Sequence, residues 1–222
     1  MKHPDNILIL DESDTVPAPG SYTIHRAAAR PPRREILLLR HGSTEGNALR
    51  RYIGRTDEPL SAEGRAALAE RRLAFPAPPA VYVTPLRRTR ETAELLFPDA
   101  RQITVPGLRE MDFGDFENRS FADMAGDAAY RAWVDSGCLA PIPNGESREG
   151  FTARCCAAFR AVLSQDKSAR LVFVVHGGTI MALCSALVRP PRDYYDWQAK
   201  NGAGFLLRTL GAGPEMELAG EI

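Results

Sequence analysis

Long apolar runs are missing from this sequence of 222 residues. No stretch approaches the roughly 20 apolar residues that a membrane span requires. The early run "ILIL" is too short for the hydrophobic core of a signal peptide, and acidic residues follow it closely. The sequence therefore predicts a protein without a membrane partner, located in the cytoplasm.

Cysteine is scarce and unpatterned. The four cysteines, Cys138, Cys155, Cys156 and Cys184, contain no C-x-x-C spacing, and two of them are direct neighbours in a predicted helix. Neither a disulfide framework nor a structural zinc site follows from such a set. We expect free thiols in a reducing compartment, which agrees with a cytoplasmic location.

A net charge is also missing, because 28 basic and 28 acidic residues balance. No overall field would attract the protein to nucleic acid, so no nucleic-acid partner is expected. Nearly all positive charge is arginine, since only Lys2, Lys167 and Lys200 are lysines. Codon bias in a GC-rich genome is the interpretation we favour for most of these arginines, but a few stand at positions that need a separate explanation.

The length suits one α/β domain with an appendage. Residues 1–34 form a predicted N-terminal extension, in which Ile7 to Leu10 favour a short edge strand and "AAARPPRR" favours an extended linker. A flexible tail is the alternative. Residues 35–222 form the predicted main domain.

Strand and helix signals alternate along this domain. Short apolar runs, typical of strands buried on both faces, and helical stretches between them argue for a mainly parallel sheet covered by helices on both faces, a three-layer α/β/α sandwich. Ser61 is the expected N-cap of the first helix, and Pro85 is expected in the first turn of the second. The predicted strands are Ile36–Leu39, Ala80–Val83, Ile103–Val105 and Leu171–Val175, and the helical stretches are 61–75, 85–97, 148–163 and 179–188.

Three predicted strands end on residues that carry chemistry. Arg40 and His41 follow the first strand, Arg88 opens the helix after the second, and His176 with Gly177 follows the fourth. In parallel sheets, ligands bind beyond the carboxyl ends of the strands, and glycine lets the backbone approach them. One strand-end histidine would suit a structural role, but two with arginines beside them indicate a site.

Phosphoryl chemistry fits these residue types. Arginine offers a planar fork of donors for phosphate oxygens, and a neutral imidazole can attack phosphorus to give a phosphohistidine. A second, protonated histidine would stabilise the developing charge. Metal binding is the rival interpretation, because histidine is a common ligand. The neighbouring arginines oppose it, so no metal and no cofactor are expected.

Five segments in order resemble the histidine phosphatase superfamily, the phosphoglycerate-mutase-like enzymes. "LLLRHGSTEGN" is similar to the R-H-G signature, "YIGRTDEPLSAEGR" and "VTPLRRTRETA" to the next two blocks, "LREMDFGDFE" to the block with the acidic residue, and "VVHGGTI" to the last block. The resemblance covers about Ile36 to Leu207. It implies the phosphoglycerate-mutase-like fold and a small phosphorylated metabolite as substrate.

The resemblance also implies roles for matching positions. His41 would be the nucleophile, and Arg40, Arg88 and His176 would complete the phosphate pocket with Asn47 and Gly177 as further substrate contacts. Glu110 would protonate the leaving oxygen and then activate water, which suits a carboxyl in a shielded pocket. The alternative for Glu110 is a surface carboxylate paired with Arg109.

Four positions depart from the family pattern. Ser43 stands where glutamate is usual, Thr84 where serine is usual, Met181 where arginine is frequent, and Phe116 where tryptophan is usual. None removes a residue of the implied phosphate pocket, so the departures bear on the substrate and leave the reaction unchanged. Arg55 lies near the substrate-contacting block, and substrate contact and a solvated basic loop are equally good interpretations.

Three functions compete. A phosphatase is favoured over a phosphoglycerate mutase, because "EMDFGDFENRSFADM" does not match the segment that follows the catalytic glutamate in mutases. A binding module without catalysis is opposed by the intact set of polar residues. The oligomeric state stays open, a homodimer being one option.

The stretch "WVDSGCLAPIPNGESREGF" resembles α-ribazole phosphatases, which act in cobalamin biosynthesis. It makes α-ribazole 5′-phosphate the leading single substrate, with broad-specificity and sugar-phosphate phosphatases as alternatives. Glu146 and Ser147 would reach over the pocket, or Ser147 would only cap the following helix.

Overall fold

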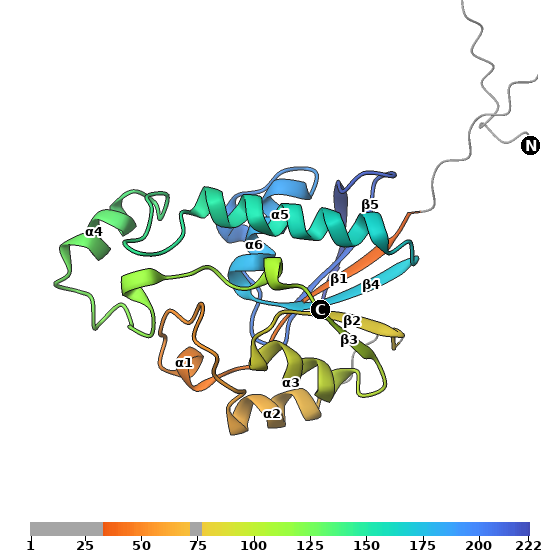
Figure 1. Cartoon of the computed structure of the whole chain (residues 1–222), viewed down its shortest axis with the longest axis horizontal. Coiled ribbons are helices and arrows are strands. Elements are labelled where there is room, and N and C mark those ends of the chain that lie inside the picture. Colours follow the sequence, from red (N-terminus) through yellow and green to blue (C-terminus); the bar gives the residue numbers. More distant parts are fainter. Residues whose placement is uncertain (1–32, 72–76) are drawn as a thin grey trace, which may run out of the picture. The chain divides into compact units, whose positions relative to one another are not determined.

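A computed structural model describes residues 33–71 and 77–222. It contains a six-stranded sheet in the order β3-β2-β4-β1-β5-β6 (Figure 1). The strands are β1 Glu35–Arg40, β2 Ala80–Val83, β3 Arg101–Thr104, β4 Arg170–Val175, β5 Gly204–Thr209 and β6 Met216–Glu221.

The four predicted strands pair in parallel, with β1 beside β4 and β2 between β4 and β3. The expected mainly parallel sheet is therefore confirmed. The last two strands, which the sequence did not indicate, extend one side of the sheet by antiparallel pairings of β5 with β1 and with β6.

The sheet is the middle of three layers. Helices α5 (Arg148–Gln165) and α6 (Gly177–Leu187) lie on one side of it, and α2 (Ala62–Ala69) and α3 (Arg87–Leu96) lie on the other (Figure 1). The remaining helices are α1 Glu45–Ala48, α4 Ala128–Asp135, and the 3₁₀ turns η1 Pro106–Leu108, η2 Gly114–Phe116 and η3 Tyr194–Trp197.

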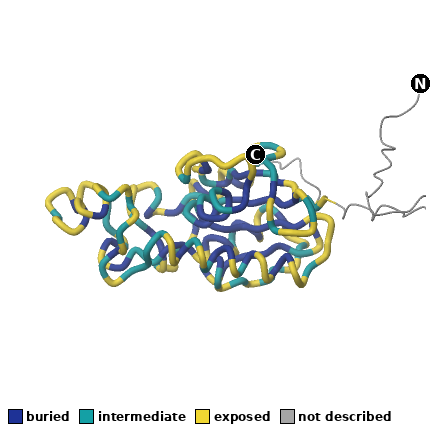
Figure 2. Tube along the Cα trace, turned by 90° about the horizontal axis from the view of Figure 1, so that it is seen from above, coloured by how far each residue is buried: buried dark blue, intermediate teal, exposed yellow. Residues whose placement is uncertain are grey.

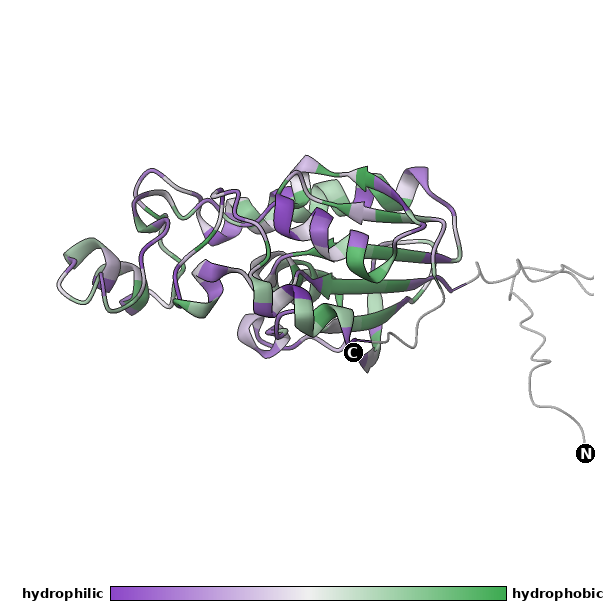
Figure 3. Cartoon of the chain, turned by 90° about the horizontal axis from the view of Figure 1, so that it is seen from below, coloured by the Kyte–Doolittle hydropathy of each residue, from purple (hydrophilic) through white to green (hydrophobic). Residues whose placement is uncertain are grey.

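The side chains of strand β1 pack against the helical layers on both faces of the sheet. Its side chains alternate, so that Ile36 and Leu38 pack into the core under α5 and α6, whereas Leu37 and Leu39 pack into the core with α3. All four are fully buried. The interior of the domain is accordingly dark blue in Figure 2, and its central strands are mostly green in Figure 3. This two-sided burial is the reason for the continuous apolar run that ends at Arg40.

The predicted ends of three elements can be compared with the structure, and two of them need correction. Ser61 caps α2 as expected, by accepting a hydrogen bond from the Gly64 N–H at 3.0 Å. Pro85 lies just before α3, whose N-cap is Leu86. The third strand begins at Arg101 and is an edge strand with partly exposed side chains, so the prediction of burial on both faces was wrong there.

Two expectations concern other parts of the chain. The strand expected at Ile7 to Leu10, like most of the expected extension, lies outside the described residues. Of the helices that the structure describes, none combines the length and the apolar character needed to traverse a bilayer.

Candidate active site

The two histidines predicted at strand ends lie together. Because β1 and β4 are parallel neighbours, His41 and His176 leave the sheet side by side, and their ring centroids are 5.2 Å apart in an edge-on arrangement. The N–H of His41 donates to the carbonyl of Val175, the last residue of β4, at 3.0 Å. The pairing of the strands thus fixes the distance between the imidazoles.

The tautomer of His41 follows from its single polar contact. Its Nδ1 lies 2.7 Å from the carbonyl oxygen of Gly42, which can only accept, so Nδ1 carries the proton and Nε2 keeps a lone pair. Burial, with smaller contributions from Arg88 and Arg40, holds the pKa of His41 well below its ordinary value. The ring is therefore neutral at neutral pH, the state in which it is a nucleophile.

His176 has both ring nitrogens engaged. Its Nδ1 accepts from Nε of Arg88 at 3.3 Å, so Nε2 carries the proton and donates to Oγ1 of Thr84 at 2.9 Å. Burial and then Arg88 lower the pKa of His176 well below its usual range. The protonated second histidine expected from the sequence is thus a neutral one here, because it is buried and because Nε of Arg88 donates to its Nδ1. Thr84 keeps the hydroxyl of the serine it replaces.

Arg88 is fully buried and braces the loop that follows α1. Its Nη1 donates to the carbonyl of Thr56 at 2.7 Å, and its Nη2 donates to those of Gly54 at 2.8 Å and Ile53 at 3.3 Å. Together with the bond to His176, these contacts use four of the five N–H groups that a guanidinium has. The remaining N–H on Nη1 makes no hydrogen bond within the described residues.

The guanidinium of Arg40 makes fewer hydrogen bonds to the protein than that of Arg88 does. Its Nη1 donates to the carbonyl of Ala199 at 2.8 Å. Its Nε is buried and has no hydrogen-bond partner among the described residues. An unpaired buried donor is costly, so this N–H favours an anionic ligand beside it.

Glu110 is buried, with 8% of its surface exposed, and its carboxylate is held by backbone groups. Oε1 accepts from the N–H of Met111 and Oε2 from the N–H of Gly178, both at 2.9 Å. The surface pairing with Arg109 is therefore wrong. Burial raises the pKa of Glu110, although the two backbone bonds and the guanidinium groups of Arg88 and Arg40 oppose this shift. A raised pKa suits a proton donor.

Arg154, on α5, fixes the segment that carries Glu110. It grips the carboxylate of Glu146 through Nε at 2.8 Å and Nη2 at 2.6 Å. Its Nη1 donates to the carbonyls of Gly107 at 3.0 Å and Arg109 at 3.1 Å. The side chain therefore joins α5 to the chain on the N-terminal side of Glu110.

Of the two interpretations of the Pro-Asn-Gly-Glu-Ser turn, the structure supports the one in which it only caps the following helix. Ser147 is the N-cap of α5 and accepts from the N–H of Gly150 at 3.1 Å. Glu146 is occupied by Arg154 and by the N–H of Asp112. Neither lines the cavity described below, so the idea that they reach over it is not supported.

Asn47 is held by a residue that the sequence reasoning missed. Its Oδ1 accepts from the N–H of Thr44 at 3.3 Å and from Nδ2 of Asn201 at 3.0 Å, so its own Nδ2 is left for a ligand. Nδ2 of Asn201 also lies 3.1 Å from the carbonyl of His41. The loop Lys200–Asn201–Gly202 carries no sequence pattern that would have indicated this link.

A cavity of about 520 Å³ brings most of the predicted residues together. Arg88 and His176 are fully buried and do not line it. A Cβ on Gly177 would lie 3.4 Å from Nε of Arg40, so the helix start packs tightly against that guanidinium. The lining residues are Arg40, His41, Asn47, Arg51, Tyr52, Ile53, Glu110, Phe113, Gly177, Gly178, Met181, Gln198, Ala199 and Lys200.

Arg55 is an exposed side chain outside this cavity, and its contact with Asp112, at 3.4 Å, is a surface ion pair. The structure therefore favours the solvated-loop interpretation. Within residues 33–71 and 77–222, no group of three or more His, Cys, Asp or Glu side chains is arranged to hold a metal ion.

Comparison with known proteins connects this site to a family. Residues 36–221 match the family model for the histidine phosphatase superfamily (branch 1). The chain is 33% identical over 165 residues to the probable phosphoglycerate mutase GpmB of Proteus mirabilis, covering 71% of this chain and 76% of that one. It is 32% identical over 162 residues to the adenosylcobalamin/alpha-ribazole phosphatase of Salmonella typhimurium, covering 70% and 80%.

Among solved structures, the chain is similar to a putative alpha-ribazole-5′-P phosphatase from Escherichia coli K-12. The TM-score is 0.74 at 27% sequence identity, and the match covers 83% of this chain and 94% of that chain.

Proposed function

Because the chain belongs to branch 1 of the histidine phosphatase superfamily, we propose that it is a phosphomonoesterase that hydrolyses a small phosphorylated metabolite through a phosphohistidine on His41. One observation carries the proposal. The bond from Nδ1 of His41 to the Gly42 carbonyl leaves the Nε2 lone pair unused, in a residue that lines the same cavity as Glu110 and Arg40.

In the first step, Nε2 of His41 attacks the phosphorus, and the bond between phosphorus and the leaving oxygen breaks. The proton of Glu110 moves to that oxygen, so the alcohol leaves neutral. Nε of Arg40 and Nδ2 of Asn47 donate to the phosphoryl oxygens, and Arg88, which is buried behind the cavity lining, adds a positive charge.

In the second step, the Glu110 carboxylate takes a proton from water, and the water oxygen attacks the phosphorus of the phosphohistidine. The bond from phosphorus to Nε2 breaks, orthophosphate leaves, and His41 is neutral again. His176 holds the guanidinium of Arg88 in place through both steps.

The substrate we propose first is α-ribazole 5′-phosphate. The similarity to the Salmonella and Escherichia coli proteins supports it, as does a cavity with room for more than a triose. The test is a panel of phosphate esters ranked by kcat/KM. An efficiency for α-ribazole 5′-phosphate no better than for a generic aryl phosphate removes it from first place and favours a broad-specificity or sugar-phosphate phosphatase.

A phosphoglycerate mutase is the second candidate, because the GpmB relative carries that name and the same phosphohistidine would serve an isomerase. A mutase returns the phosphoryl group to the substrate instead of giving it to water. Release of orthophosphate from 3-phosphoglycerate, measured beside a coupled mutase assay, separates the two activities. Turnover in either assay excludes a binding module without catalysis.

Adding one methyl group at Gly178 is expected to disturb Glu110. A Cβ there would lie 2.2 Å from Oε1 of Glu110, so the carboxylate must move away from the start of α6. Gly178→Ala should therefore lower kcat for alkyl phosphates by about 100-fold, the lower part of the range for lost general acid catalysis.

The control for this substitution is Gly211→Ala, because a Cβ on Gly211 would meet nothing within 4 Å. It should keep the kcat of the unmodified protein. Equal rates for the two variants, measured by phosphate release, would show that Glu110 does not need its position against α6.

Asn201→Ala is expected to raise KM more than it lowers kcat. The substitution removes the donor that orients Asn47, whereas the Nδ1 bond of His41 stays in place. Loss of one charge-assisted contact to phosphate predicts a rise in KM of about tenfold. Steady-state kinetics with Asn201→Ala, Asn47→Ala and the double variant measure this. Additive effects of the two substitutions would contradict the link between them.

A further inference from the structure

We propose that Tyr52, Ile53, Phe113 and Met181 form an apolar subsite for a flat ring in the alcohol part of the substrate, and that Met181 sets this preference. The inference rests on the proposed phosphatase function and narrows its substrate class. The four side chains line the cavity that also contains His41, Arg40 and Glu110, so a phosphate ester held by the polar end would extend its alcohol part over them.

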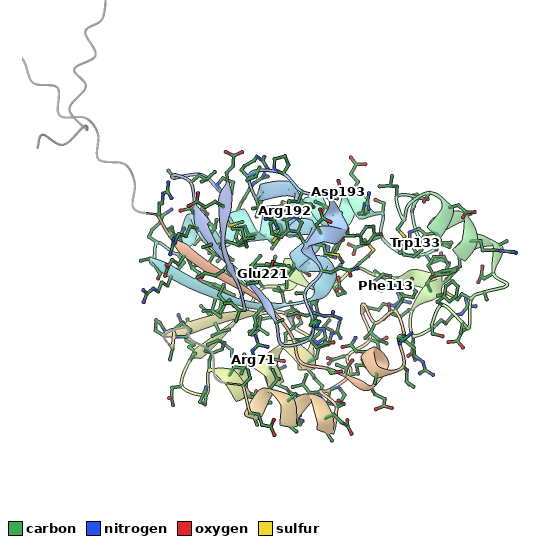
Figure 4. The ribbon with its side chains drawn as sticks, turned by 180° about the vertical axis from the view of Figure 1, so that it is seen from behind. Arg71, Phe113, Trp133, Arg192, Asp193 and Glu221 are labelled. Atoms are coloured by element: carbon green, nitrogen blue, oxygen red, sulfur yellow. The ribbon has the colours of Figure 1, made fainter. Side chains whose placement is uncertain are left out.

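The two aromatic residues of this apolar subsite, which is called the apolar wall below, are held in place by contacts with each other and with residues outside the cavity. The rings of Tyr52 and Phe113 have centroids 5.1 Å apart. Tyr52 also packs edge-on against Trp133 at 5.8 Å, and its hydroxyl is 2.7 Å from that of Tyr130. Figure 4 shows Phe113 and Trp133 at the same end of the domain. A surface of this kind is held in one shape before a ligand binds, which reduces the entropy that binding costs.

Met181 joins this wall to the polar end of the cavity. It follows Gly177 by four residues and Gly178 by three in α6, so all three occupy one face of the helix. Gly177 and Gly178 line the cavity beside Arg40 and Glu110. The thioether is half-buried and flexible, and sulfur packs well against ring edges.

Two cations at the rim of the cavity could attract an anionic alcohol part, but their exposure to solvent makes this attraction weak. Arg51 and Lys200 are both exposed, and Arg51 donates to Oδ1 of Asn118 at 3.4 Å. Ion pairs between exposed groups contribute little, because water and salt screen them. Burial of a ring against Tyr52, Phe113 and Met181 removes apolar surface from water, and this effect is not screened.

Three esters of primary alcohols test the preference without changing the chemistry of the leaving group. They are 2-phenylethyl phosphate, n-butyl phosphate and 3-carboxypropyl phosphate, whose alcohols have similar basicity. We expect kcat/KM for the phenylethyl ester to exceed that of the carboxypropyl ester by about tenfold or more, the effect of burying one ring.

Substitution at position 181 tests the assigned residue. Met181→Arg places a cation in the wall, so the ratio between the phenylethyl and carboxypropyl esters should fall by about tenfold or invert. Met181→Leu keeps an apolar side chain and should keep the ratio within about twofold. Leu95→Arg adds the same charge at an exposed position of α3 outside the cavity and should leave the ratio unchanged.

The outcomes separate this inference from the function it rests on. No phosphate release from any ester, including 4-nitrophenyl phosphate, overturns the proposed function and the subsite with it. Hydrolysis of all three alkyl esters with equal efficiency, or a preference for the carboxypropyl ester, overturns the subsite alone. An unchanged ratio in Met181→Arg removes Met181 from its assigned role.

Discussion

Replacing His41 by alanine is expected to lower the rate of phosphate release by about 10⁴-fold or more, because the variant lacks the atom that forms the covalent intermediate. His176 cannot take its place. Both of its ring nitrogens are engaged, one by Thr84 and one by Arg88, and its side chain does not line the cavity. Water is left as the only nucleophile beside the bound phosphoryl group.

Trapping the intermediate gives the direct measurement. Rapid acid-free quenching with a ³²P-labelled ester should yield a protein-bound label that is stable in base and lost in acid, as a phosphoramidate is. The label should disappear in His41→Ala, with a thermal unfolding midpoint close to that of the unmodified protein as the control for folding. Residual turnover above about a hundredth of the original rate, or a label that persists in the variant, would assign the nucleophile elsewhere.

Replacing Glu110 by glutamine is expected to lower kcat for alkyl phosphates by about 10²- to 10⁴-fold, the usual contribution of a general acid. The first step with 4-nitrophenyl phosphate should be affected far less, since nitrophenolate leaves without a proton. A burst of nitrophenol followed by a slow steady state is the expected course in this variant, because water activation also needs Glu110. Equal slowing of the burst and of alkyl ester cleavage would exclude Glu110 as the proton donor.

The shifted pKa values of Glu110 and His41 predict how kcat/KM depends on pH. Burial raises the pKa of Glu110, so the protonated acid persists to a higher pH than for an exposed glutamate, and kcat/KM falls as pH rises through that value. Burial lowers the pKa of His41, so the nucleophile is lost only at low pH. In Glu110→Gln the alkaline fall assigned to Glu110 should vanish while the acid fall persists. An unchanged alkaline fall in the profile of kcat/KM contradicts the assignment.

Glutamine is an imperfect replacement, for a reason visible in the structure. Each oxygen of Glu110 accepts one backbone N–H, from Met111 and from Gly178. Glutamine has one oxygen, so one of these N–H groups would face an amide nitrogen that cannot accept. Glu110→Asp retains two oxygens on a shorter side chain, and comparing the two variants separates lost acid chemistry from lost anchoring.

The strands that carry the site could be predicted because burial on both faces leaves a strong pattern. The run from Ile36 to Leu39 is apolar without interruption, and so is the run in β4. The last two strands lack it. In β5 the apolar run is only Phe205–Leu207, followed by Arg208, and β6 contains glutamates and a glycine, so neither has the longer apolar run of β1 or β4. These antiparallel strands are defined by their partners, which the local sequence does not contain.

The residues of the site also fall into those that the sequence could predict and those that it could not. His41 and His176 could be found because each directly follows a buried strand. The roles of Asn201 and Arg154 could not, because each depends on contacts with backbone carbonyls more than 40 residues away, and loop or helix positions of this kind have no periodic signature. The charge state of His176 also escaped prediction, since it depends on complete burial and on the direction in which Arg88 points.

The position of β1 has a consequence for how the protein is made. This strand contains the first described residues of the sheet, yet its two neighbours, β4 and β5, begin at Arg170 and Gly204. A ribosome that adds about 5 to 20 residues per second must therefore work for roughly another ten seconds or more before β1 can pair on both sides. Until then at least one edge of β1 is without its partner strand, and His41 lacks first Val175 and Asn201 and later Asn201 alone. Activity is accordingly one of the last properties the nascent chain acquires, and a chain shortened before Gly204 would leave β1 with an open edge available to another molecule.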